Sequence, residues 1–511
     1  MGTDVATFAG DAHDPANVSA RLVGMGFEFG PSRVVTRSLL DTFDGRLSRA
    51  GLRLELREGE GLELILTGAG SAGAHLAVAS VPRFPEDLPP GPFRSRLVAV
   101  ADVRALLPIL RVTATRTVGV RHNRAGKIVA SVTIHEHVRS DSHDVAPWTI
   151  EIDELTGYAK HATKARDALA QIGLSRVNGD TLTIAAAASG VHLAGASRPA
   201  DVPLDPTMPA IVGFRAVLAE LADTIVANWP GTVERLDPEF LHDMRVAVRR
   251  TRTVLAEGKK VLPPAIVERA EKRFGWLGSV TGPVRDLDVH LINWTTDTNS
   301  LARDVVAALE PVHLLLERQS ESAHDALAHV LESAEAAELK TAAERWWREP
   351  ALDERPGVDG DQPLGKVVTK RIARAHAKLI KRGRLIHADA PPEQVHDLRK
   401  DAKTLRYLLE CFGGLLHDAP RKAFVRRLKA FQDNLGEHHD AAIHVVALRT
   451  ISRELHSGGG SPETMLAIGQ LIAQIDQRRV ATRLEFAEHF AAYDTKATQR
   501  DLDAALVGVN R

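Results

Sequence analysis

The feature that most constrains this chain is an internal duplication. The stretch LHDMRVAVRRTRTVL, residues 241–255, has a second copy, VHDLRKDAKTLRYLL, at residues 395–409, which is 154 residues later. The same offset aligns GPVRDLD, which begins at Gly282, with GEHHDAA, which begins at Gly436. Because an ungapped match over about 45 residues is typical of a repeated unit, the C-terminal part is predicted to contain two copies of one helical unit.

Each copy places a histidine and several cations on one face of a helix. Positions i, i+3, i+7 and i+10 return to the same side because an α-helix has 3.6 residues per turn. The aligned residues are His242, Arg245, Arg249 and Arg252 in the first copy and His396, Arg399, Lys403 and Arg406 in the second. Cations on one stripe repel each other, so the duplicated stripe predicts an anion opposite it. A solvated face with acidic partners elsewhere is the alternative interpretation.

The doubled motif also supports a family resemblance. The pattern H-x-x-R-x-x-x-R/K-x-x-R, followed by LG at 277–278 and RDLD at 285–288, resembles the CHAD family, the conserved histidine α-helical domains. The second copy, HDLRKDAKTLRY followed by LKAFQDNLGEHHD, is similar to the second half of that family. The resemblance extends from near Met208 to the C-terminus. It implies two repeated four-helix units with inorganic polyphosphate bound in a basic channel between them.

A second basic stripe precedes the second copy. Lys366, Lys370, Arg374, Lys378 and Arg382 recur every four residues. If this helix packs beside residues 393–410, the two stripes form a trough that suits a long polyanion, because Arg engages two phosphate oxygens and Lys acts as a point charge. A solvated lysine face is the alternative. The predicted polyphosphate-binding residues are His242, Arg245, Arg249, Arg250, Arg252, Lys370, Arg374, Lys378, His396, Arg399, Lys400, Lys403 and Arg406.

Charge is distributed unevenly along the chain although the net charge is only −1. Residues 364–431 contain 17 Lys and Arg against 6 Asp and Glu, whereas residues 301–361 contain 6 against 14. A concentrated basic region raises the local concentration of an anionic ligand whatever the global sum. Few aromatic residues lie among these cations, so base stacking has little support and nucleic acid is not the favoured partner.

Three aspartates accompany the basic stripes. Asp286 and Asp440 occupy equivalent positions in the two copies, and Asp288 lies beside the first of them. Aspartates next to phosphate could bind Mg²⁺, but repeated Arg–Asp pairs more often lock helices or orient basic side chains. The structural role is the favoured interpretation. His438 and His439 have no partner cluster at zinc spacing, so no zinc site is predicted there.

The first 190 residues are predicted to be α+β, with strands dominant. Alternating or continuous apolar runs predict strands at 34–40, 52–57 and 62–67, and the turn at 123–126 predicts a hairpin. The segment LLDTFDGRLSRAGLRLELRE resembles the CYTH family, the triphosphate tunnel metalloenzymes. The matching residues are Asp41, Thr42, Asp44, Leu47, Ala50 and Gly51. The resemblance implies an antiparallel barrel whose lumen holds a triphosphate through basic side chains and a divalent metal through carboxylates.

The chain departs from the CYTH pattern where the chemistry would take place. No Glu-x-Glu-x-Lys motif precedes Val34, and Glu55 stands where the family has the first Arg of L-R-x-R. Glu151 and Asp153 remain as an i, i+2 pair on one face of a strand, which could hold Mg²⁺ or Mn²⁺ through oxygen ligands. These departures favour a degenerate barrel. A metal-dependent triphosphatase or polyphosphatase in this barrel is the alternative function.

Composition and the segments rich in Gly, Pro and Ser predict the domain organisation. The predicted parts are a CYTH-like domain at 1–190, a linker at 191–208, and a CHAD domain at 209–511 with repeats at about 209–350 and about 364–511. One cysteine, Cys411, excludes an intramolecular disulfide and fits a reducing compartment. The absence of a signal-peptide pattern and of a long apolar run favours the cytoplasm. The predicted partner is inorganic polyphosphate, with localisation at polyphosphate granules as an extension of that prediction.

Overall fold

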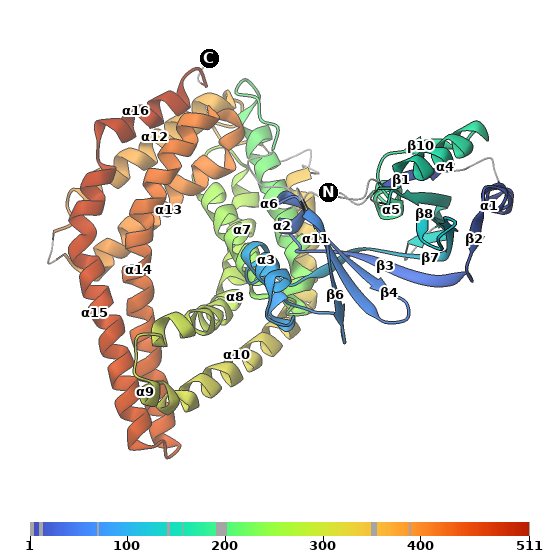
Figure 1. The fold of residues 1–511 in the computed structure, drawn as a ribbon. Coiled ribbons are helices and arrows are strands. Elements are labelled where there is room, and N and C mark those ends of the chain that lie inside the picture. Colours follow the sequence, from blue (N-terminus) through green and yellow to red (C-terminus); the bar gives the residue numbers. More distant parts are fainter. Residues whose placement is uncertain are drawn as a thin grey trace. The chain divides into compact units, whose positions relative to one another are not determined.

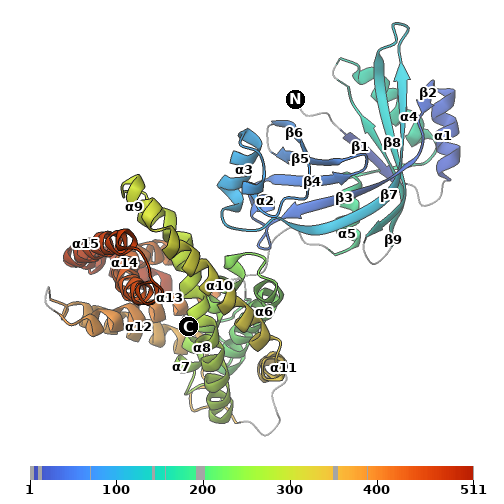
Figure 2. The same cartoon turned by 90° about the horizontal axis from the view of Figure 1, so that it is seen from below.

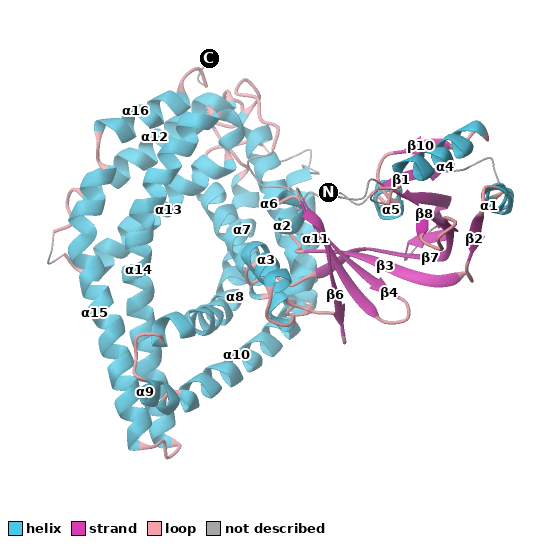
Figure 3. Cartoon of the chain, in the orientation of Figure 1, coloured by secondary structure: helices cyan, strands magenta, loops and turns pink. Residues whose placement is uncertain are grey.

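The computed structural model describes residues 5–9, 14–68, 71–140, 144–155, 157–190, 202–348, 355–387 and 390–509. It divides into two compact units, Met1–Ala196 and Ser197–Arg511. Within the described ranges, the named strands belong to the first unit and the second is helical (Figure 3). Residues 191–201 of the predicted linker and residues 353–354 of the predicted connection between the repeats lie outside the described residues.

The N-terminal unit is built on one antiparallel sheet of ten strands. The strand order is β10-β1-β9-β8-β7-β3-β4-β5-β6, with β2 paired to β7. The strands are β1 (Val5–Ala9), β2 (Phe27–Phe29), β3 (Arg33–Asp41), β4 (Leu52–Glu58), β5 (Leu62–Gly68), β6 (Ser71–Val78), β7 (Leu107–His122), β8 (Ile128–Ser140), β9 (Asp144–Asp153) and β10 (Ser175–Val177). Among the described residues no pairing joins β10 to β6, so the predicted barrel is an open sheet. The long strand β7 joins its two halves (Figure 2).

Five α-helices and one short 3-10 helix accompany the sheet in this part of the chain. They are α1 (Pro15–Gly24), α2 (Arg46–Arg49), η1 (Pro85–Asp87), α3 (Pro92–Ala101), α4 (Ala159–Gln171) and α5 (Thr181–Ala188). Helix α5 packs on β7, β8 and β9, and Leu182 joins Leu39 and Val112 in one apolar cluster. The predicted hairpin is confirmed, since Gly126 takes a φ of 73° in the turn between β7 and β8, a conformation that favours glycine.

The C-terminal unit shows the duplication directly in its helix boundaries. Its helices are α6 (Ala210–Val233), α7 (Pro238–Glu257), α8 (Pro264–Thr298), α9 (Arg303–Ala308), α10 (Glu310–Leu331), α11 (Ala334–Arg348), α12 (Leu364–Gly383), α13 (Pro392–Cys411), η3 (Gly413–Leu415), α14 (Asp418–Ser457), α15 (Pro462–Tyr493) and α16 (Lys496–Leu506). The first residues of α6, α7 and α8 precede those of α12, α13 and α14 by 154 positions each. The two copies are therefore built from the same helical unit.

The two copies meet at equivalent residues. Pro209 and Pro363, which are 154 positions apart, form an isolated antiparallel bridge. The Ala210 N–H donates to the Gln362 carbonyl and the Leu364 N–H donates to the Met208 carbonyl, each at 2.8 Å. These hydrogen bonds are exchanged between equivalent positions, which is the pattern of a local two-fold relation. The repeats therefore face each other rather than follow one another in a row.

The first motif helix, α7, is held by a side-chain cap and by apolar packing. The Asp237 carboxylate accepts hydrogen bonds from the Glu239 and Phe240 N–H groups, which caps α7. Leu241, Met244 and Val248 are buried in a core that both repeats share. A second core forms where α9 and α10 pack against the far ends of α14 and α15 (Figure 1).

Among the helices that the structure describes, none combines the length and apolar character that a membrane span needs.

Candidate functional site

A basic cavity lies between the two copies of the motif helix. Helices α7 and α13 pack against each other, and a cavity of about 570 Å³ opens beside them. This cavity is called the basin. Its lining residues are His242, Arg245, Arg249, Arg285, Asp286, Val289, His290, Asn293, Asp297, Arg399, Lys403, Glu437, His439, Asp440, Ala441, Ile443, His444, Ile475 and Arg478. Residues of both repeats therefore line one cavity.

Cations in the basin outnumber carboxylates. Six lining residues are Arg or Lys and four are Asp or Glu. Asp440 lies 2.9 Å from Arg399, and Asp297 lies 2.7 Å from Arg478, so these two carboxylates already have partners. Within the described residues, Arg249 and Lys403 form no ion pair. Because uncompensated cations crowded together attract a counter-ion, this part of the basin is suited to an anion.

The backbone of α8 positions the first arginine of the motif. Nη1 of Arg245 donates to the Gly278 carbonyl at 3.2 Å and to Thr281 Oγ1 at 3.1 Å. A Cβ atom at Gly282 would lie 3.4 Å from the same Nη1 atom. At the equivalent position of the second repeat, a Cβ atom at Gly436 would lie 3.9 Å from Nη2 of Arg399, so both glycines face the aligned arginine of their own repeat.

Electrostatic crowding is strongest at Lys403. Burial lowers the pKa of Lys403 to about 7, and repulsion by Arg399 and Arg249 acts in the same direction. Burial, with the charges of Arg399 and the neighbouring His396, also lowers the pKa of His439 to about 4. An anion in the basin would offset this repulsion and favour the protonated forms of both groups.

Two histidine pairs, one stacked and one tilted, belong to the same region. The rings of His396 and His439 are 4.8 Å apart with an interplanar angle of 30°. The rings of His290 and His444 are 4.3 Å apart, and Nδ1 of His444 lies 3.2 Å from Asp297. Burial, followed by the charge of His444, lowers the pKa of His290 to about 4. Only His396 among these residues was predicted as a ligand, and it stacks on a lining residue.

Besides His396, four predicted ligands on the motif helices lie outside the basin lining. Arg250 forms a close ion pair with Glu410, and Arg406 lies 2.8 Å from the same carboxylate. This cluster joins α7 to α13, so Arg250 and Arg406 hold the repeats together and do not line the basin. Lys400 is exposed and lies 3.3 Å from Asp397. Arg252 is exposed and lies outside the basin lining.

The basic stripe of α12 does not form the predicted trough. Helix α12 packs beside α13 as expected, but Lys378 and Arg382 each lie 2.8 Å from Asp401. Asp401 occupies the side of α13 opposite the motif stripe, because it is two residues past Arg399. Lys370 and Arg374 are exposed and absent from the basin lining. The alternative interpretation, a solvated face, therefore describes the basic stripe of α12 better than the trough does. Two of its cations are paired with Asp401.

Several basin residues were not predicted as ligands. Arg285 and Asp286 belong to the RDLD motif, which had been assigned a structural role only. His290, His444 and Arg478 carried no stripe or spacing signal. Helix periodicity finds residues that share one face of one helix, whereas these side chains meet only through tertiary packing. The structural role expected for Asp288 and Asp440 agrees with their contacts, at 2.8 Å to His324 and 2.9 Å to Arg399.

In the N-terminal unit, arginines and carboxylates neutralise each other inside the sheet. Arg37 lies 2.8 Å from Glu55 and 3.0 Å from Asp180, and Arg53 lies 2.6 Å from Asp180. Arg57 lies 2.5 Å from Glu55. Glu55 stands where the CYTH pattern has an arginine, and it forms ion pairs with Arg37 and Arg57. These guanidinium groups are therefore not available to bind a triphosphate. Asp180 caps α5 and brings the second carboxylate.

The predicted metal pair does not fit a divalent cation. Glu151 Oε1 accepts hydrogen bonds from the Thr181 N–H at 2.9 Å and from Thr181 Oγ1 at 2.6 Å, and it lies 3.6 Å from Arg37. The other oxygen, Oε2, lies 3.6 Å from Nε2 of His135, so nitrogen and hydroxyl donors surround the carboxylate, whereas Mg²⁺ and Mn²⁺ need several oxygen ligands. Glu151 thus anchors the start of α5. Burial, together with the charge of Glu151, raises the pKa of Asp153.

Elsewhere in the described residues, one group of three possible metal ligands is formed by Glu239, His242 and Asp243. The guanidinium of Arg285 lies 3.5 Å from Glu239, so this group already has a cationic neighbour. It is an arrangement of adjacent side chains on one helix rather than a built metal centre.

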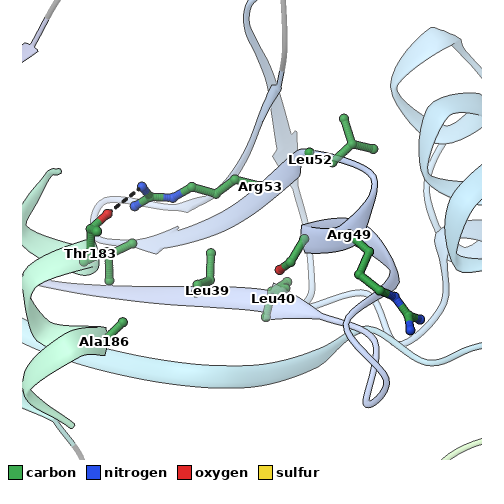
Figure 4. Close-up of a pocket in the computed structure, with 10 residues that line it drawn as sticks. Leu39, Leu40, Arg49, Leu52, Arg53, Thr183 and Ala186 are labelled. Carbon is green, nitrogen blue, oxygen red and sulfur yellow. Dashed lines mark hydrogen bonds between the residues drawn. The ribbon is translucent and has the colours of Figure 1, made fainter. Parts of the chain in front are cut away.

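A separate pocket of about 440 Å³ lies between β3, β4 and α5 (Figure 4). Leu39, Leu52 and Leu182 contribute apolar lining. Arg53 lies at its edge and donates to Thr183 Oγ1 at 3.3 Å. Because Arg53 is also bound to Asp180, its charge is not free for a ligand. Arg49, the other arginine in the lining, lies 3.2 Å from Asp44, so both lining arginines have carboxylate partners.

Comparison with known proteins identifies the helical unit. Residues 216–449 match the family model described as CHAD domain. The chain contains a CHAD domain. Both motif helices and the whole α7–α13 contact lie inside the matched residues. No curated protein is similar enough in sequence to be reported as a relative.

Solved structures resemble each unit. The CHAD domain from the plant Ricinus communis is 26% identical, with a TM-score of 0.49 over 59% of this chain and 97% of that chain. PptA from Streptomyces chartreusis is 18% identical, with a TM-score of 0.43 over 55% and 99%. A candidate adenylyl cyclase from Hippeastrum, described as having a dominant triphosphatase activity, is 10% identical, with a TM-score of 0.29 over 37% and 96%.

Proposed function

We propose that the CHAD domain of this protein binds inorganic polyphosphate in the basin between its two repeats. The observation that carries the proposal is that Arg245 and Arg249 of one repeat and Arg399 and Lys403 of the other line a single cavity. A chain of phosphates places negative charges at short, regular intervals, so it can contact both helices at once. A compact anion would reach fewer of these cations.

The pairing of charges around the basin supports this assignment. Arg250 and Arg406 share Glu410, which holds α7 beside α13 without using the cations that face the cavity. Arg249 and Lys403 are left without carboxylate partners in the described residues. Since buried or half-buried cations are normally paired, their arrangement favours a ligand that supplies the negative charge. Association of the protein with polyphosphate granules is part of the same proposal.

Binding of long-chain polyphosphate to the full-length protein at fixed salt tests the proposal. The double variant Arg249→Glu/Arg399→Glu changes one cation in each repeat and is expected to abolish binding. The matched control Arg426→Glu/Lys429→Glu makes the same change in net charge at exposed positions of α14. The control is expected to bind almost as well as the wild type. Equal losses in the two variants, or no binding by the wild type, would overturn the proposal.

The alternative function, a metal-dependent triphosphatase in the N-terminal unit, receives no support from the geometry. Arg37 and Arg53 are paired with carboxylates, and Glu151 is held by Thr181. Phosphate release from tripolyphosphate, measured with and without Mg²⁺ or Mn²⁺ and in Glu151→Ala, tests it directly. Metal-dependent release that Glu151→Ala abolishes would restore the alternative.

A further inference from the structure

The two motif helices differ at one position that faces the basin. Arg249 in the first repeat corresponds to Lys403 in the second, whereas Arg245 and Arg399 are the same residue type. An arginine keeps its charge at any physiological pH, but a lysine readily changes protonation state when it is buried among other cations. Lys403 is therefore the one member of this four-residue set that can respond to pH.

Lys403 lies among charged groups of α7, α13 and α14, and Arg285 and Asp286 of α8 and Glu437 of α14 also line the basin. Helix α13 itself contributes Arg399 and Arg406, and α7 contributes Arg249. Helix α14 contributes His439 and Asp440, but the Asp440 carboxylate is already 2.9 Å from Arg399. Lys378 and Arg382 of α12 pair with Asp401 on the other side of α13. Lys403 thus stands half-buried in the basin with no ion pair in the described residues.

We propose that polyphosphate binding in the basin is coupled to the uptake of a proton by Lys403. The coupling rests on the proposed function, since it requires that the polyanion enters the basin. The empty basin favours an uncharged amine at Lys403, because burial and the neighbouring guanidinium groups act against the ammonium form. A polyphosphate chain beside the amine reverses this preference, because each phosphate attracts the ammonium and offsets the repulsion.

The sign of the coupling follows from the two states of the amine. The pKa of Lys403 is lowered to about 7 in the empty basin, and an anion raises it toward the ordinary lysine value. Below pH 7 the amine is protonated in both states, so little proton uptake accompanies binding. Above pH 7 the free protein must gain a proton, so affinity falls as the pH rises. At pH 8 about 0.9 proton is taken up per bound basin, and affinity falls roughly tenfold between pH 7 and 8.5.

The two basin histidines whose pKa values are strongly lowered do not produce this pattern. The pKa values of His290 and His439 are lowered to about 4, so both are already neutral above pH 7 and contribute only under acidic conditions. The terminal phosphates of the ligand lose protons as the pH rises through neutrality, which strengthens binding to cations. A decrease in affinity at alkaline pH therefore reports a group of the protein that loses positive charge.

Calorimetry of the full-length protein with long-chain polyphosphate tests the coupling. Titrations at pH 8 and constant ionic strength, in two buffers with different ionisation enthalpies, measure the protons taken up on binding. Lys403→Arg introduces the residue type that the first repeat has at Arg249 and keeps this position positively charged at pH 8. This variant is expected to take up almost no protons and to bind about tenfold more tightly than the wild type at pH 8.5. Lys366→Arg, at an exposed position of α12, is the matched control and is expected to keep the wild-type uptake.

The outcomes separate this inference from the proposed function. The expected uptake at pH 8 is about 0.9 proton. If the wild type binds at pH 6.5 but takes up less than about 0.2 proton at pH 8, the coupling is wrong, whereas the proposal of polyphosphate binding is unaffected. If Lys403→Arg remains folded and keeps the wild-type proton uptake, the proton goes to another group and the assignment to Lys403 is wrong. If the wild type does not bind at pH 6.5, where Lys403 is charged, the proposed function itself fails.

Discussion

Replacement of Arg249 by methionine should weaken polyphosphate binding while it stabilises the fold. The guanidinium has no ion pair in the described residues, and its buried Nε atom has no hydrogen-bond partner. Arg399 and Lys403 are its charged neighbours across the basin. A buried donor without a partner costs about 1–3 kcal/mol, so its removal should raise the free energy of unfolding by about 1 kcal/mol. Methionine keeps most of the apolar stem and fits irregular gaps.

The expected loss of affinity can be estimated from the contacts that Arg249 would make. A hydrogen bond that involves a charged group contributes about 1.5–3 kcal/mol, which corresponds to a roughly 10- to 100-fold loss of affinity at fixed salt. Loss of one phosphate contact should also reduce the slope of log K against log salt concentration by about 0.7.

Two assays on the same samples test this prediction. Fluorescence anisotropy with labelled long-chain polyphosphate measures affinity over a salt series, and calorimetry measures thermal unfolding. Arg426→Met removes an exposed arginine from α14 and serves as the control for net charge. The reasoning is refuted if Arg249→Met binds as tightly as Arg426→Met, or if its CHAD domain unfolds at a markedly lower temperature than the wild type.

Three further predictions concern residues outside the basin. Arg250→Ala breaks the ion pair with Glu410 and should lower the free energy of unfolding of the CHAD domain by roughly 1–2 kcal/mol in denaturant titrations, while the folded protein binds polyphosphate with nearly unchanged affinity. Lys370→Ala/Arg374→Ala should leave that affinity within about twofold at physiological salt, because these exposed side chains lie outside the basin; a tenfold loss would revive the trough. In the N-terminal unit, burial alone would raise the pKa of Glu55 and of Asp180, but Arg37 lowers the first, and Arg53 and Arg37 lower the second. Their folded-state pKa values therefore lie below the unfolded ones, so the stability that they contribute is present above about pH 5 and is lost as the pH falls toward 3. Arg37→Ala should lower the free energy of unfolding of this unit by about 3–5 kcal/mol at neutral pH. The unfolding temperature of the variant should also depend less on pH under acidic conditions, which thermal unfolding at a series of pH values would measure.

The duplicated motif made the helical unit predictable, and it marked four residues that line the candidate site. One offset aligns the sequences of α7 and α13, and the same offset relates their first residues in the structure. The motif residues Arg245, Arg249, Arg399 and Lys403 line the basin because helix periodicity fixes which side chains share a face. Helix periodicity does not predict which other elements each face of the helix packs against.

The predicted ligands that lie outside the basin are those whose position and ion pairs depend on tertiary packing. Arg250 and Lys378 carry the right charge on or beside the right helices, but Glu410 and Asp401 bind them. Arg478 reaches the basin from α15, where no repeat or stripe marked it. In the N-terminal unit the reversed charge at Glu55 was visible in the sequence. Its partner Arg37 was not, because the two strands pair only in the folded sheet.

A crystal structure of the full-length protein with bound long-chain polyphosphate tests the central claim most directly. The account predicts a phosphate chain in the basin, in contact with Arg249 from α7 and with Arg399 and Lys403 from α13. Phosphates bound only along the exposed face of α12, or contacting one repeat alone, would contradict it.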